Sequence, residues 1–451
     1  MTSRSARLSV LLQSARLSVL LLCALLSVGC GVTSGPESTS SAEPTSTSES
    51  ASAANPYEEQ RRAGVETLLA QWAEAIRNDD ADAIREVMDP SAPPEFVQSE
   101  LRRAAALTDV PLDDWGYELV DEPETPVPSS VATPLDAADV WAPSVVLRYA
   151  VTGPDTESTT RPVSLLVAKR GDRWRIVSDT EIPGIDRRTW KGPWDFGPVT
   201  ATSVQTSGGT SVVLGHPAQS ALVARLVAEL PSAVAAVTEF YGSEWPRKTL
   251  LIAAGSPAEF AASGGSVAAG TDVAAVTVSD VVSPDVPVTG QRVIFSPVAQ
   301  ERLDEFSTRS VLRHELTHVA ARTNTVDGSP TWILEGFADY AGYRGSGADF
   351  GRLAPTLARV VAAGGPPTVL PEDSDFTAGG VRSTLAYESA WSVCAYVAEQ
   401  FGEPALRTLY GLLATGPRSA TEIDEALRAT TGANASEFVT AWGSWVLRRS
   451  R

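Results

Sequence analysis

Residues 307–320 have the sequence STRSVLRHELTHVA, which combines a polar start with apolar residues three and four positions apart. At this spacing Leu312, Leu316 and Val319 share one face of a helix, and that face is expected to pack on a core. Ser307 or Thr308 is the expected N-cap, because a hydroxyl can accept from the first free amides of the helix. The stretch therefore predicts a buried helix in the second half of the chain.

Two imidazoles lie on another face of this predicted helix. His314 and His318 are four residues apart and stack one turn apart, so both can bind one Zn²⁺. Glu315 projects beside them, where it can take a proton from a metal-bound water without being a ligand itself. The chain has only three histidines, so a chance pairing around this glutamate is a poor explanation. The third, His216, follows a predicted strand and is interpreted as a surface or strand-end residue.

A catalytic zinc ion usually has three protein ligands, and a second helical stretch supplies the missing one. Residues 329–340 read SPTWILEGFADY, with Ser329 as the expected N-cap. Glu335 is the expected third ligand. Asp339 lies one turn further along the same face, where its carboxylate can accept the free ring N–H of a ligating histidine.

The two stretches together resemble the gluzincin peptidases, and most of all the bacterial peptidase-MA-like domains. In that family the two histidines and the later glutamate bind zinc, and the glutamate inside the first motif is the general base. The resemblance thus assigns the metal to His314, His318 and Glu335, and the base to Glu315. Its expected extent is residues 201–451, a small sheet followed by a helical bundle.

Further features of the resemblance concern the substrate. Tyr387 opens an apolar helix that ends at Gly402, and it resembles the tyrosine that donates to the oxyanion in related gluzincins. Aminopeptidases of the group carry a Gly-x-Met-Glu-Asn stretch, whereas this chain has methionine only at positions 1 and 88. An endopeptidase is therefore favoured over an aminopeptidase. Residues 266–280 are the candidate edge strand that would pair with an extended peptide.

Residues 58–183 have a different pattern, with three helical stretches followed by strand-like runs at 115–120, 140–151, 162–168 and 174–177. Residues 169–172 read as a hairpin turn. Helices followed by a curved antiparallel sheet resemble the nuclear-transport-factor-two-like superfamily, the cystatin-like roll. This part has no histidine and no cysteine, and it shows no catalytic constellation. Residues 184–200 are the expected linker, and the whole chain is expected to be α+β.

The N-terminus resembles a bacterial lipoprotein signal. Within residues 1–29, basic residues precede an apolar run, and Cys30 follows directly as the expected lipidated residue. Residues 30–57 are rich in Ser, Thr, Pro and Glu and are expected to be a tether from the outer face of the membrane. Cys394 would be the sole thiol of the mature chain, and its apolar surroundings favour a small buried side chain.

Charge and motif together limit the function classes. A net charge of −19 opposes binding to phosphate backbones, so nucleic acid is excluded as a partner. The leading hypothesis is a membrane-anchored zinc peptidase acting on a peptide or protein substrate. The alternatives are an inactive cell-envelope binding lipoprotein on the same scaffold and a zinc hydrolase acting on a non-peptide amide.

Overall fold

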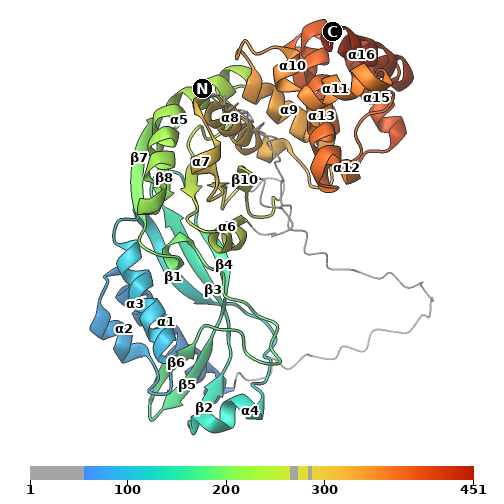
Figure 1. Cartoon of the computed structure of the whole chain (residues 1–451). Coiled ribbons are helices and arrows are strands. Elements are labelled where there is room, and N and C mark those ends of the chain that lie inside the picture. The colour runs from blue at the N-terminus through green and yellow to red at the C-terminus, as the bar shows by residue number, and fades with distance from the viewer. Residues whose placement is uncertain (1–54, 265–272, 283–286) are drawn as a thin grey trace, which may run out of the picture.

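The protein is an α+β chain whose parts follow one another in chain order. The structure, a computed structural model, describes residues 55–264, 273–282 and 287–451. Figure 1 shows an amino-terminal part of helices and sheets, a middle part around a separate sheet, and a carboxy-terminal bundle of helices. The amino-terminal part and the bundle lie at opposite ends of the molecule.

The amino-terminal part has three helices followed by two antiparallel sheets. The helices are α1 (Pro56–Arg77), α2 (Ala81–Val87) and α3 (Pro94–Leu107). One sheet has the order β1 (Leu112–Leu119), β3 (Ser144–Val151), β4 (Thr159–Ser164), and the other has the order β2 (Asp139–Trp141), β5 (Leu166–Arg170), β6 (Arg173–Ser178). Short turns of helix, α4 (Ser129–Ala132) and η1 (Thr133–Leu135), precede β2.

Two of the expected strands are wrong in one respect, because each is divided between the two sheets. The run 140–151 breaks at Ala142 and Pro143 into β2 and β3, and the run 162–168 breaks at Leu165 into β4 and β5. At the first break Pro143 has no amide hydrogen to continue a ladder, which favours the change of sheet there. The expected hairpin is confirmed: β5 pairs with β6 through Arg170 and Arg173, across a two-residue turn that begins with Gly171.

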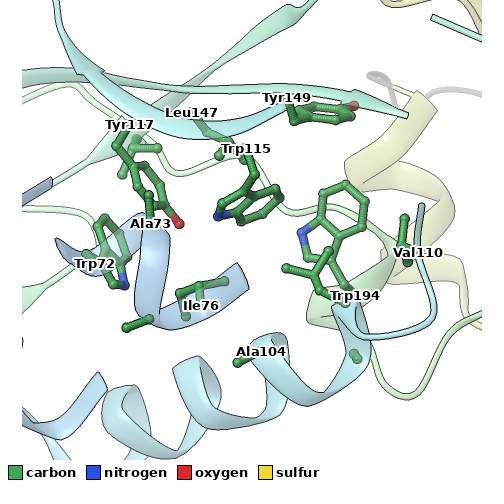
Figure 2. Close-up of a cluster of buried hydrophobic side chains, with 14 of the residues drawn as sticks. Trp72, Ala73, Ile76, Ala104, Val110, Trp115, Tyr117, Leu147, Tyr149 and Trp194 are labelled. Carbon is green, nitrogen blue, oxygen red and sulfur yellow. The ribbon is translucent and has the colours of Figure 1, made fainter. Parts of the chain in front are cut away.

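A buried aromatic cluster fills the space between these helices and β1 and β3, as Figure 2 shows. Trp72 stacks on Tyr117 at a centroid distance of 3.8 Å, and Trp115 meets Trp194 edge to face at 5.4 Å. Trp194 belongs to η2 (Pro193–Asp195), which lies in the expected linker, and it is 2% exposed. The linker residues are therefore part of the core of this domain.

The middle sheet is mixed and has five strands. Its order is β10 (Ala275–Val278), β11 (Arg292–Phe295), β9 (Leu250–Ala253), β8 (Gly209–Gly215), β7 (Thr200–Thr206). β9 is parallel to both β8 and β11, while β10 and β7 are antiparallel to their neighbours. Side chains alternate along a strand, and here both faces are buried. Val212 and Leu214 pack with the amino-terminal domain, whereas Val213 packs with α5 and α8.

Helix α5 (Ser220–Tyr241) covers the second face of the sheet. The short turn η3 (Pro217–Gln219) precedes it directly. The combined stretch Pro217–Tyr241 is the one helix among the described residues that is long and apolar enough to cross a membrane. Leu226, Leu230 and Val234 on this helix are fully buried in the core that it shares with the sheet and α8. One face of α5 is thus part of the packed core, and 39% of its apolar window is buried.

Helices make up nearly all of the rest. After α6 (Pro257–Gly264) and β11 they are α7 (Ala299–Arg302), α8 (Glu305–Ala321), η4 (Arg322–Asn324), α9 (Thr331–Tyr343), α10 (Phe350–Leu353), α11 (Pro355–Gly364), α12 (Asp373–Thr377), α13 (Gly380–Phe401), α14 (Glu403–Leu413), α15 (Ala420–Thr431) and α16 (Ala435–Arg449). A separate apolar core unites α9, α11 and α13 to α16.

Helix α9 approaches its two neighbours at glycine residues. A Cβ at Gly336 would lie 2.4 Å from the carbonyl oxygen of Ala390 on α13, and one at Gly342 would lie 2.7 Å from that of Ser310 on α8. Real Cβ atoms do not approach backbone oxygen so closely. The distance between α9 and each neighbour therefore depends on the missing side chains.

We expect Gly336→Ala to destabilise the protein by about 1–3 kcal/mol, because the added methyl must push α9 and α13 apart in a packed core. Gly411→Ala is the matched control, since Gly411 lies on α14 with nothing within 4 Å of its Cβ position. That change should be neutral or stabilising. Denaturant unfolding of the two variants measures the difference, and equal midpoints would show that the close crossing has no energetic role.

Candidate metal centre

Helix α8 carries the predicted histidines through the middle of the structure. It begins at Glu305, with Asp304 as N-cap, so the expected caps Ser307 and Thr308 are wrong by one turn. Asp304 accepts from the amide of Ser307 at 2.8 Å, and the Ser307 hydroxyl takes the reciprocal bond from the Asp304 amide. Ser307 thus occupies the third position of a capping box.

Helix α9 also begins slightly later than expected. Its first residue is Thr331, preceded by Pro330 at the cap position. The hydroxyl of Ser329 donates to the carbonyl of Val326 and does not cap the helix. Instead, the carboxylate of Asp373, on α12, caps the helix by accepting from the amide of Thr331 at 2.8 Å.

The structure brings His314, His318 and Glu335 together. Their possible ligand atoms all lie within 4.8 Å of one another, and the two Nε2 atoms are 3.0 Å apart. The oxygens of Glu335 lie 3.4 Å from Nε2 of His314 and 3.8 Å from Nε2 of His318. Two atoms bound to one tetrahedral zinc at about 2.0–2.1 Å are about 3.3 Å apart, so the three side chains fit such an ion with small adjustments.

Asp339 supports the first histidine from behind. Its Oδ1 lies 2.8 Å from Nδ1 of His314. A carboxylate at this place accepts the Nδ1 proton, which leaves Nε2 with its lone pair directed at the ligand cluster. The predicted placement of Asp339 one turn after Glu335 therefore gives the predicted contact.

The protonation of the cluster follows from its charges. Burial opposes the charged form of His314, but the neighbouring charge and hydrogen bond of Asp339 outweigh it and raise the pKa of His314 to about 10. Burial lowers the pKa of His318 to about 4. The two Nε2 atoms face each other at 3.0 Å, at the place where a divalent cation fits.

Glu315 lies beside the cluster and has its own partner. The Thr277 hydroxyl, on β10, donates to Oε2 of Glu315 at 2.6 Å. Oε1 of Glu315 is buried and accepts no hydrogen bond from the described residues. Burial raises the pKa of Glu315 to about 7. A carboxyl of this pKa can exchange a proton near neutral pH, as a general base must.

Tyr387 is two turns inside its helix, because α13 begins at Gly380 and not at Tyr387 as expected. Its ring meets Phe376 edge to face at a centroid distance of 5.0 Å. Tyr387 and Asp339 line one cavity of about 520 Å³, together with Ser310, Tyr343 and Trp391. The structure therefore places this tyrosine on a hollow that extends to the supporting acid of the ligand cluster.

The sequence analysis assigned no role to two polar residues that lie near the site. Thr277 was part of the expected edge strand but was not assigned a role, although a hydroxyl between two valines marks a strand face that is not simply apolar. Glu388, next to Tyr387, is a cavity residue whose pKa burial raises to about 7. Its carboxylate accepts from the amide of Leu357 at 2.6 Å, and sequence spacing gave no sign of this contact.

His216 lies at a strand end as expected, but its interpretation as a surface residue is wrong. It is 8% exposed, and its Nε2 lies 2.8 Å from the buried carboxylate of Glu259 on α6. Its Nδ1 lies 2.8 Å from the carbonyl oxygen of Pro198. The hydrogen bond to Glu259 raises the pKa of His216. These contacts join the linker to α6.

Other sequence predictions fall outside the described residues. Cys30, the signal segment and most of the tether belong to residues 1–54, and the first part of the expected edge strand belongs to residues 265–272. The described remainder of that edge is β10, which occupies the end of the strand order. Cys394 is a buried free thiol, as predicted.

A comparison with protein families found a match in the carboxy-terminal half of the chain. A family profile of the peptidase MA superfamily matches residues 278–448, which include both motif helices. A comparison with curated proteins gave no match.

Several solved structures are similar in part. The M1 zinc metallopeptidase from Deinococcus radiodurans aligns at 16% identity with a TM-score of 0.31, over 61% of this chain and 58% of that one. Aminopeptidase A from Legionella pneumophila, in complex with aspartic acid, aligns at 14% identity with a TM-score of 0.32, over 68% of this chain and 33% of that one. The chain thus spans 58% or less of the length of these enzymes. On the family match, residues 278–448, called the peptidase-like domain below, are similar to the peptidase MA superfamily.

Proposed function

We propose that this protein is a zinc metallopeptidase held by a lipid anchor on the outer face of a bacterial cytoplasmic membrane. The observation that carries the proposal is the convergence of His314, His318 and Glu335, with Glu315 beside them. A zinc ion held by these three side chains would supply a Lewis acid for the scissile carbonyl and the attacking water.

The remaining chemistry falls to side chains of this chain. Glu315 takes a proton from the attacking water and delivers it to the leaving amine, so that the peptide bond breaks without a net proton change. Asp339 holds His314 in the tautomer that presents Nε2 to the metal. Tyr387 donates its hydroxyl to the negative charge that develops on the carbonyl oxygen.

The edge of the middle sheet supports a peptide as the substrate. β10 pairs only with β11 among the described strands, and it lies against α8. An extended peptide can add to such an edge through main-chain hydrogen bonds, and this edge would align the substrate beside the ligand cluster. We favour an endopeptidase, because the stretch that holds the substrate amine in related aminopeptidases is missing from the sequence.

Glu315→Gln should keep the metal and lose activity. The amide cannot accept the proton of water, so kcat should fall by about 10²–10⁴-fold, while His314, His318 and Glu335 still bind about one zinc per chain. Metal analysis and digestion of a peptide library measure both properties, with Glu305→Gln on the exposed start of α8 as control. A wild-type protein without zinc at neutral pH would favour the inactive binding lipoprotein instead.

Asp339→Ala should weaken zinc binding by about 10–100-fold, because His314 loses the acceptor that fixes its ring. Activity should then recover in part when zinc is added in excess. Competition with a chelator of known affinity gives the zinc dissociation constant of wild type and variant. Equal constants would mean that Asp339 does not support the ligand.

Tyr387→Phe should lower kcat by about 10²–10³-fold with little change in KM and no change in zinc content. The ring remains and only the donor to the developing charge is lost. Tyr396→Phe is the matched control on the same helix, since Tyr396 packs against Phe401, Phe438 and Trp445. If Tyr387→Phe kept the wild-type kcat, the oxyanion donor would have to be another group, such as Tyr343 in the same cavity.

Cys30→Ala should release the protein from the membrane fraction or stop its processing. The Gly29-Cys30 junction after the apolar run motivates this, since lipidation needs the thiol. The tether after Cys30 would hold the folded part on the order of 25–30 Å from the membrane. Fractionation and the mass of the mature chain measure the effect, and an unchanged mass and distribution would indicate an uncleaved anchor.

A further inference from the structure

The amino-terminal domain contacts the peptidase-like domain two residues beyond β10. Asp280 accepts from the hydroxyl of Thr159 at 2.6 Å and from the guanidinium of Arg161 at 2.6 Å, and both donors lie on β4. The hydroxyl of Thr289, which lies just before β11, is a third donor to the Asp280 carboxylate, at 2.7 Å. The charge of Arg161 holds the pKa of Asp280 below its ordinary value although burial opposes this. The carboxylate is thus an ionised link between the two domains.

A second ion pair joins the same domains at the neighbouring strand. Arg292 of β11 donates to both oxygens of Asp155, at 2.6 and 2.8 Å, and the two side chains are 4% and 6% exposed. Arg292 is also the register partner of Val278, the last residue of β10. Because a lost partner would leave a buried charge, this pair resists separation of the domains. The ends of β10 and β11 are therefore both attached to the amino-terminal domain.

The side chains of β10 alternate between the two domains. Val276 packs in the core shared with the amino-terminal domain, whereas Ala275 packs in the core shared with α8. Thr277 follows the second direction, and its hydroxyl reaches Glu315. A one-residue shift of β10 would exchange these faces and withdraw the hydroxyl from Glu315.

We propose that the amino-terminal domain is a positioning element of the candidate active site: the Arg161–Asp280 ion pair fixes the end of β10, and Thr277 on that strand orients Glu315. The inference rests on the proposed function for its kinetic consequences. It gives the first domain, which has no catalytic constellation of its own, a defined task. Arg161 and Asp280 act through Thr277, and Thr277 acts through Glu315.

A competing local contact makes the proposal open to refutation. Arg322, just after α8, donates to the hydroxyl of Ser279 at 2.8 Å, so the peptidase-like domain also holds β10 by itself. If this contact were sufficient, loss of the Arg161 pair would leave β10 unchanged. The tests below therefore compare variants of the two domains within the full-length chain.

The first test measures β10 without reference to activity. In Arg161→Ala, hydrogen–deuterium exchange of peptides covering residues 273–282 should become about tenfold faster than in wild type, because the strand end opens locally. Arg161→Lys, which keeps a charge near Asp280, should restore part of the protection. Arg148→Ala is the matched control: Arg148 lies on the adjacent strand β3 and pairs with Asp114 and Glu118 inside the first domain. Wild-type exchange of this segment in Arg161→Ala would overturn the proposal.

The second test separates positioning of the base from binding of the substrate. Thr277→Val should lower kcat by about tenfold, with KM and zinc content unchanged, because the strand backbone remains and only the hydroxyl is lost. Thr277→Ser should restore kcat. Arg161→Ala should lower kcat as well, whereas Arg148→Ala should not. A wild-type kcat in Thr277→Val, in an enzyme that binds zinc and cleaves peptide, would overturn the link from Thr277 to Glu315.

The exchange test can fail or succeed independently of the proposed function. A wild-type protein that binds no zinc or cleaves no peptide would contradict the peptidase proposal. The exchange experiment would still decide whether the amino-terminal domain holds β10, because it needs neither metal nor substrate.

Discussion

The gathering of five ionisable side chains between α8 and α9 is the constraint on which the rest of the structure depends. His314, Glu315 and Glu335 are buried, and His318 and Asp339 are partly buried beside them. Water solvates separate charges poorly there, so such groups are tolerated only when they share protons or a cation. The helices must therefore be held at distances that keep nitrogen and oxygen atoms within reach of one another. Glycines at the crossings of α9 allow that approach, and the two apolar cores on either side keep the helices in place.

The middle sheet links α8 to the amino-terminal domain. One of its faces packs on α5 and α8, and the other packs on the aromatic residues of the amino-terminal domain, so neither face is left to solvent. Trp194 extends the shared core into the linker. The site thus rests on a three-layer arrangement in which the first domain forms the outer layer. The linker packs in the core between the domains and does not act as a hinge.

Local sequence patterns predicted the parts of the fold that local forces determine. Histidines four residues apart and a carboxylate pair one turn apart specify helix faces. With the need for a third zinc ligand and the resemblance to gluzincin peptidases, they predicted the ligand cluster and the contact of Asp339. The start of α13 could not, because its first turns before Tyr387 have no apolar period. Contacts between distant segments were also hidden: Arg161 and Asp280 are 119 positions apart, and each alone resembles a solvated surface charge. The burial of His216 and its contact with Glu259 were hidden for the same reason, since only the fold brings the two side chains together.

The close crossing of α9 and α13 contains a buried thiol whose reactivity depends on the packing of these helices. Cys394 faces Gly336, with its sulfur 3.0 Å from the position that a Cβ there would take, and it is completely buried. Burial raises the pKa of this thiol well above its usual range, so it is protonated and unreactive while the helices stay together. A thiol reagent can reach it only when the helices packed around α13, α9 with Glu335 among them, separate. The rate of modification at this sulfur would therefore report openings of the helical core behind the metal-binding residues, without any added label.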